Sequence, residues 1–67
     1  MLCTAVIHRE EEWFVAECPE ADTASQGKTV EKAIANLREA THLYLEEFPA
    51  KVVSHPILAA FEVQAHA

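Results

Sequence analysis

Apolar and polar residues are arranged in two short strand-like runs at the start of this chain. The runs cover residues 2–8 and 13–18 and are rich in apolar and β-branched side chains. Between them, residues 9–12 read Arg-Glu-Glu-Glu. Two such runs joined by a short polar connection are typical of a β-hairpin. The pattern therefore predicts two antiparallel strands.

The register of this hairpin decides which side chains share a face of the sheet. A turn centred near Glu10 and Glu11 pairs Ile7 with Phe14. One face then carries small and apolar side chains, which suit a closely packed helix, and the other is only partly apolar and could meet a partner. The first face consists of Cys3, Ala5, Ile7, Phe14, Ala16 and Cys18, and the second of Leu2, Thr4, Val6, His8, Trp13, Val15 and Glu17.

A third, weaker strand is expected after the hairpin. Pro19 ends the second strand because proline cannot donate to a strand ladder. Residues 22–26 are polar and alternate, which predicts a strand at the sheet edge. Gly27 is expected to supply a turn with unusual backbone angles.

One long amphipathic helix follows. Thr29 is a natural N-cap, and Glu31 complements the positive end of the helix dipole. Pro49 stops the pattern, so we expect about five helical turns. The apolar face recurs at spacings of three and four: Val30, Ala33, Ile34, Leu37, Ala40, Thr41, Tyr44, Leu45 and Phe48.

The last part of the chain alternates again. Residues 50–56 are expected to form a connection, and residues 57–65 a half-buried strand. A right-handed crossover places that strand beside the first and parallel to it. The prediction is a single α+β domain over residues 1–67, a two-layer βββαβ fold with one amphipathic helix on a mixed sheet. No C-terminal DNA-binding domain is expected.

Size and composition favour self-association. A chain of 67 residues buries only about 60% of its unfolded surface, so an isolated monomer is marginal. Hydrophobic residues nevertheless make up 51% of the sequence. We expect some of them to lie at a subunit interface, giving a homo-oligomer, a dimer or a tetramer.

Charge restricts the choice of partner. Eleven acidic and five basic residues give a net charge of −6. Affinity for nucleic acid depends on Lys and Arg neutralising phosphates, so direct nucleic-acid binding is not expected, and a basic protein suits the charge better.

No apolar run approaches the roughly 20 residues that span a bilayer, and no signal sequence is recognisable. The expected location is cytoplasmic.

Paired carboxylates are the first candidate for chemistry, because the βββαβ order resembles the first half of a ribonuclease-H-like fold. Nucleases of that fold need several Asp or Glu side chains converging on divalent metal. The first strand carries Thr4, Val6 and His8 where a metal-binding Asp is expected, and no spacing brings Glu17 and Asp22 together. We therefore expect no nuclease site in this chain, since a fold need not imply its chemistry.

Metal binding and nucleophilic catalysis have no support in the spacing of residues. Cys3, Cys18 and the histidines lack the close pairs typical of zinc sites. The two cysteines are expected to be buried free thiols, which could form a disulfide only under oxidising conditions. Gly27 is the only glycine, so a phosphate-binding loop is excluded. No catalytic residue, metal ligand or cofactor is expected.

The segment from Trp13 to Thr29 carries a family resemblance. Residues 13–20 read Trp-Phe-Val-Ala-Glu-Cys-Pro-Glu, residues 26–29 read Gln-Gly-Lys-Thr, and an amphipathic helix follows. This order resembles the HicB-like antitoxins, with their aromatic-x-Val-Ala-x-x-Pro-Glu and Gln-Gly-x-Thr segments. The resemblance is strongest between Trp13 and Glu47. A glycine common before the strand aromatic is replaced here by Glu12.

The resemblance implies a fold, a degenerate half ribonuclease-H-like βββαβ domain without catalysis, and also a function. HicB-like proteins bind a small basic toxin, HicA, that cleaves messenger RNA, and cover its active surface. By resemblance this chain is a short antitoxin-like protein that binds and neutralises a HicA-type toxin and is not an enzyme. Full-length relatives carry a further DNA-binding domain, so operator binding is not carried over.

The partner-binding residues are inferred from charge and expected exposure. They combine one aromatic side chain with the acidic turn of the hairpin and the acidic end of the helix. An orphan oligomeric interaction module without a surviving toxin partner is the alternative reading, and an enzyme or metal protein is the third. The predicted contact residues are Glu10, Glu11, Glu12, Trp13, Glu46 and Glu47.

Overall fold

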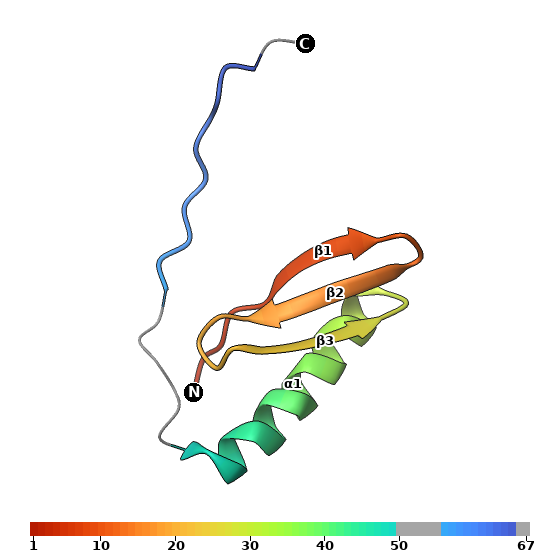
Figure 1. Ribbon diagram of the computed structural model, residues 1–67, viewed down its shortest axis with the longest axis vertical. Coiled ribbons are helices and arrows are strands. Elements are labelled where there is room, and N and C mark those ends of the chain that lie inside the picture. The colour runs from red at the N-terminus through yellow and green to blue at the C-terminus, as the bar shows by residue number, and fades with distance from the viewer. Residues whose placement is uncertain (50–55, 66–67) are drawn as a thin grey trace.

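Three strands and one helix form two layers in the computed structural model, which describes residues 1–49 and 56–65 (Figure 1). The strands form an antiparallel sheet in the order β1-β2-β3, and the helix covers one face of it. The α+β class and the first four predicted elements are confirmed. Their bounds are Val6–Glu10 (β1), Trp13–Cys18 (β2), Thr23–Gly27 (β3) and Val30–Glu47 (α1).

The hairpin register differs from the predicted one by two residues. Ile7 pairs with Ala16, where the prediction paired it with Phe14. The loop is only two residues long and lies one position further along, with Glu11 in the left-handed region at a φ of 55°. Because side chains alternate with a period of two, a shift of two leaves each side chain on its predicted face. The predicted pairing was wrong, while the predicted division of the two strands into faces is correct.

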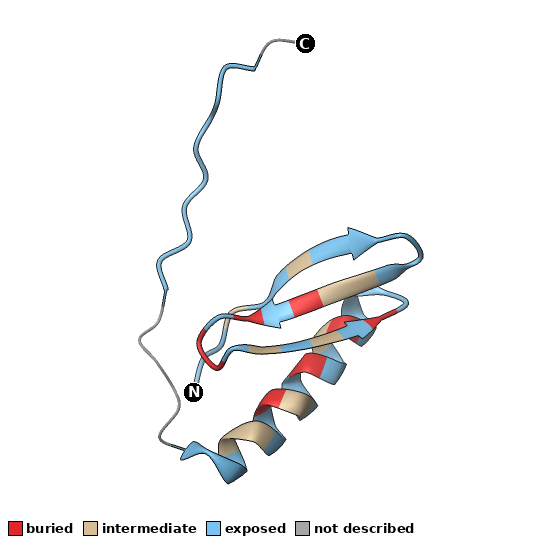
Figure 2. Ribbon diagram, in the orientation of Figure 1, coloured by how far each residue is buried: buried red, intermediate tan, exposed pale blue. Residues whose placement is uncertain are grey.

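Few residues are buried between the sheet and the helix (Figure 2), and most of them have small side chains. Ile7 and Phe14 pack against the edge of this layer from the hairpin, and Tyr44 and Leu45 do so from α1. Small residues allow α1 to approach the sheet closely, as the sequence predicts for this face. The fully buried apolar residues are Ala16, Cys18, Ala21, Ala33 and Leu37.

Gly27 is required by close packing and not by backbone angles. Its φ is not positive, so the predicted turn with unusual angles is wrong. A Cβ built at this position would lie 2.6 Å from the backbone nitrogen of Ala33 and 2.8 Å from the Cβ of Lys32. Real Cβ atoms do not approach this closely, so only glycine lets the end of β3 meet the first turn of α1.

The helix begins and ends as predicted. The Thr29 hydroxyl accepts a hydrogen bond from the backbone N–H of Lys32 at 3.0 Å, which caps the first turn. The helix is fixed to β3 by polar contacts along its length. Asn36 Nδ2 donates to the carbonyl of Gln26 at 2.8 Å, and the hydroxyls of Thr23 and Thr41 lie 2.6 Å apart.

A buried carboxylate holds the N-terminal segment against the loop between β2 and β3. The Glu20 side chain is only 1% exposed, and it accepts hydrogen bonds from the Thr4 backbone N–H at 3.0 Å and the Thr4 hydroxyl at 2.6 Å. The Cys18 thiol donates a third at 3.5 Å. These bonds, led by the Thr4 hydroxyl, lower the pKa of Glu20 from 4.5 to about 2, against the opposing effect of desolvation.

The predicted fourth strand is absent from the part of the chain that the structure describes. Residues 56–65 have no regular secondary structure and are exposed at every position. Figure 1 shows them running away from the sheet. Residues 2–5, which were predicted to belong to the first strand, also lie outside it. Most of the predicted connection, residues 50–55, falls outside the described residues.

Replacing Gly27 by alanine tests the close approach of β3 and α1. Because the contacted atoms include backbone, the structure must shift, and we expect Gly27→Ala to lower the free energy of unfolding by about 1–3 kcal/mol. Urea unfolding followed by circular dichroism measures this change. The control Ala24→Ser lies at an exposed position of the same strand and should stay within about 0.5 kcal/mol of the unmodified chain. Equal stability of Gly27→Ala and the control would contradict the packing argument.

Replacing Glu20 by glutamine tests the buried carboxylate. A pKa that is lower in the folded state stabilises the fold above the unfolded pKa of 4.5, and that contribution is lost as the pH falls through about 2. Glu20→Gln should therefore have a lower urea midpoint than the unmodified chain at neutral pH. The gap should close progressively below pH 4.5. Glu39→Gln, at an exposed helix position, is the control. A gap that persists unchanged into strong acid would contradict this role.

Candidate partner-binding surface

The sheet face opposite the helix is open to solvent in this chain. The observed register places alternate residues of each strand on it, and they mix apolar, imidazole and carboxylate side chains. Figure 2 shows exposed and half-buried positions along β1. In β2, the residues on this face, Trp13, Val15 and Glu17, are likewise exposed or half-buried. This face is therefore less apolar than the face that packs against the helix, but it is not fully polar. Its residues are Val6, His8, Glu10, Trp13, Val15, Glu17, Ala24 and Gln26.

Trp13 forms the apolar centre of the hairpin end of this face. It is 39% exposed and directly follows the turn made by Glu11 and Glu12. The Lys28 ammonium lies 4.3 Å from the centroid of the Trp13 ring, and 3.8 Å from Glu12 Oε2. The Lys28 ammonium therefore contacts both the Trp13 ring and an acidic neighbour, and both side chains of the Lys28–Glu12 pair are largely exposed.

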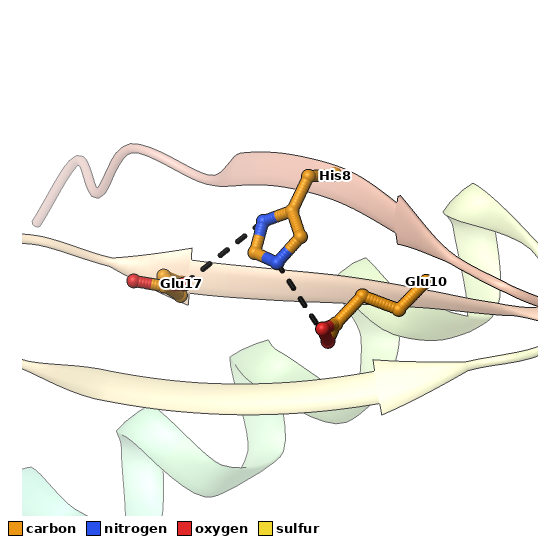
Figure 3. Close-up of polar contacts among 3 residues, drawn as sticks. All are labelled: His8, Glu10 and Glu17. Atoms are coloured by element: carbon orange, nitrogen blue, oxygen red, sulfur yellow. Dashed lines mark ion pairs between the residues drawn. The ribbon is translucent and has the colours of Figure 1, made fainter.

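His8 lies between two carboxylates on the same face (Figure 3). Its Nε2 is 3.8 Å from Glu10 Oε2, and its Nδ1 is 4.0 Å from Glu17 Oε1. All three side chains are at least half exposed. His8 and Glu17 lie on the face predicted for them, although neither is among the predicted contact residues.

The predicted contact residues fall into two separate groups. Glu10, Glu11, Glu12 and Trp13 lie together at the hairpin end. Phe14 pairs with Gly27 close to that end, so α1 also begins there and runs away from it. The helix has 18 residues, which corresponds to a length of about 27 Å. Its acidic end, at positions 46 and 47, therefore lies far from the hairpin turn, at the other end of α1.

The acidic helix end has its own local partner. His42 Nε2 lies 3.6 Å from Glu46 Oε1, one helical turn away, and both side chains are largely exposed. Glu47 is also exposed and closes the helix. Pairs of this kind on a helix surface contribute little to stability. Glu46 and Glu47 therefore supply charge at the surface rather than a preformed pocket.

The described residues contain few groups suited to covalent or metal chemistry. Within residues 1–49 and 56–65, no group of three or more His, Cys, Asp or Glu is placed to hold a metal ion. Cys18 is buried as predicted, whereas Cys3 is exposed, and both are free thiols. Desolvation and the neighbouring Cys18 raise the pKa of Cys3, which disfavours the nucleophilic thiolate. The buried Glu20 carboxylate is occupied in holding Thr4.

A membrane-spanning role finds no support in the helix. In the described part of the chain, no helix is both long and apolar enough to cross a bilayer. The exposed side of α1 carries many charged residues instead.

Comparisons with protein-family models, with curated proteins and with solved structures found no match to this chain. The assignment of a function therefore rests on the sequence segment between Trp13 and Thr29 and on the chemistry of the open face.

Proposed function

We propose that this chain is a non-catalytic antitoxin-like protein that binds and neutralises a small basic HicA-type toxin, an enzyme that cleaves messenger RNA. The observation that carries the proposal is the hairpin end of the open face, where the exposed Trp13 directly follows three consecutive glutamates and has Lys28 against its ring. The resemblance of residues 13–29 to HicB-like antitoxins points to the same class of partner. Such a protein acts in the cytoplasm, where its target enzyme works.

Charge complementarity explains how binding would inhibit the toxin. An RNA-cleaving enzyme holds phosphates with exposed Lys and Arg side chains. The carboxylates at Glu10, Glu11 and Glu12 offer those cations an alternative anionic partner. Trp13 adds apolar contact area at low conformational cost, which is typical of the centre of a protein interface. A partner seated here would have its RNA-binding surface covered.

The two acidic groups would act differently in this complex. A small partner on the hairpin does not reach the far end of a helix about 27 Å long. Exposed charges separated by more than about 8 Å are largely screened at physiological ionic strength. Glu46 and Glu47 would therefore speed the approach of a basic protein at low salt, while the hairpin residues would hold it.

An orphan oligomeric interaction module is the second candidate. The exposed apolar residues of segment 56–65 favour it, because they point to contacts with another chain that need no toxin. We also propose a homo-oligomer for the antitoxin-like protein. The two candidates therefore differ in whether a toxin is bound and not in whether the chain self-associates.

Matched charge reversals separate the hairpin from the helix end. Glu11→Lys with Glu12→Lys, and Glu46→Lys with Glu47→Lys, change the net charge equally at two sites that lie far apart. We expect the hairpin pair to weaken toxin binding at least about tenfold, and the helix pair to stay within about threefold at physiological salt. Calorimetric titration with the product of the adjacent small reading frame measures both. Equal weakening by the two pairs would show that only net charge matters. No weakening by the hairpin pair would show that the site is wrong.

Removing the Trp13 side chain tests the apolar centre of the surface. A buried aromatic anchor is worth about 2 kcal/mol or more at an interface, so Trp13→Ala should reduce toxin affinity about 30-fold. Leu43→Ala is the control, since Leu43 is a large apolar residue that is 55% exposed on α1. Surface plasmon resonance should find the loss mainly in a faster dissociation rate. Similar affinities for the two variants would contradict a role for Trp13.

A further inference from the structure

Two segments that were predicted as strand are missing from the sheet. Both were predicted to lie at the edge formed by the first strand. Residues 2–5 and 57–65 carry strand-like patterns but lie outside β1, β2 and β3. In the described residues the sheet ends at β1, so its outer row of N–H and C=O groups has no strand beside it. An unpaired edge of this kind is a template for a further strand.

An apolar groove lies next to residues 1–5, which lead directly into β1. It has a volume of about 510 Å³ and is bounded by residues 1–5, the end of β2 and one side of α1. Ile34, Leu37 and Leu45 line it from the helix, and Leu2 lies across from them. Leu2 is largely exposed, and Ile34 and Leu45 are half-buried, so the groove leaves apolar surface uncovered.

Segment 56–65 has the pattern that such a groove requires. Its odd-numbered positions are apolar, and Ile57, Phe61 and Val63 are 94%, 85% and 73% exposed. The surface area of the chain is 5649 Å², about 1,400 Å² more than a compact monomer of this mass exposes. The radius of gyration is 14.0 Å, against about 11 Å for a compact domain of this length.

We propose that residues 57–65 of one copy add as a fourth strand to the β1 edge of a second copy, and that the exchange is reciprocal. Ile57, Phe61 and Val63 would then cover the groove beside residues 1–5 of the partner, and Leu2 would gain a neighbour. The segment would run parallel to β1, as its position in the chain order predicts. Each chain would thus supply the strand that the other lacks.

A second copy explains the structure better than the chain's own sheet does. The segment lies away from its own β1 although the two are covalently tethered (Figure 1). The excess exposed area also exceeds the roughly 800 Å² per partner that a stable interface buries.

This inference does not depend on the proposed toxin. The exchanged strand would occupy the edge of β1, whereas the proposed toxin surface is the open face at the hairpin end. A dimer built in this way would display two hairpin ends. The experiment that tests it therefore uses the full chain alone.

Light scattering and isotope-filtered NMR on the full chain decide the question. We expect a dimer, with contacts between Phe61 or Val63 of a labelled copy and β1 residues of an unlabelled one. A monomer at micromolar concentration would overturn the proposal, whether the segment is unpaired or folded onto its own sheet. A dimer whose Phe61 contacts are all within one chain, or all at the open face, would overturn it as well.

Two matched substitutions make the test specific. Phe61→Glu and Gln64→Glu each add one negative charge. Phe61 lies on the apolar side of the segment and Gln64 on the polar side. We expect Phe61→Glu to raise the dimer dissociation constant at least about tenfold while the helical circular dichroism is retained. Gln64→Glu should leave the dimer intact. Equal effects from the two variants would contradict insertion of Phe61 into the groove.

Discussion

The small apolar layer between α1 and the sheet is the constraint on which the rest of this structure depends. Four of its five fully buried apolar residues are alanine or cysteine, and Leu37 is the one larger aliphatic side chain. Small residues let the helix lie close to β2 and β3, and Gly27 permits the closest approach. The small size of these buried residues also limits how much apolar surface the chain removes from water. A layer of this size leaves other apolar groups without internal partners.

Polar contacts compensate for part of this limit by fixing the borders of the layer. Glu20 holds Thr4 at one end, and Thr29 caps the helix at the other. What remains uncovered is divided between two surfaces of different character. The hairpin end of the open face combines three glutamates with Trp13 and Lys28, whereas the groove beside residues 1–5 is mainly apolar. The proposed antitoxin function and the proposed strand exchange use these two surfaces separately.

Local signals predicted most of the fold. Thr29 and Pro49 marked the ends of the helix, and the alternation in residues 13–18 identified which side of the hairpin packs against it. The predicted hairpin register is wrong by two residues because a Glu-rich connection specifies turn geometry only weakly. The predicted turn role of Gly27 is wrong because the need for glycine there comes from a tertiary contact with α1. The Glu20–Thr4 pair had no local signal, since the two residues are 16 positions apart. The strand predicted for residues 57–65 is absent from the sheet, because an alternating pattern cannot by itself supply a neighbouring strand to pair with.

The most direct test of the account is a competition measurement between RNA and this chain for the toxin. A catalytically silent HicA-type toxin from the adjacent reading frame would be titrated with the chain at increasing concentrations of its RNA substrate. If the acidic face covers the RNA-binding surface, the apparent dissociation constant should rise in proportion to the RNA concentration. A dissociation constant that is independent of RNA, or the absence of any complex, would contradict the proposed function.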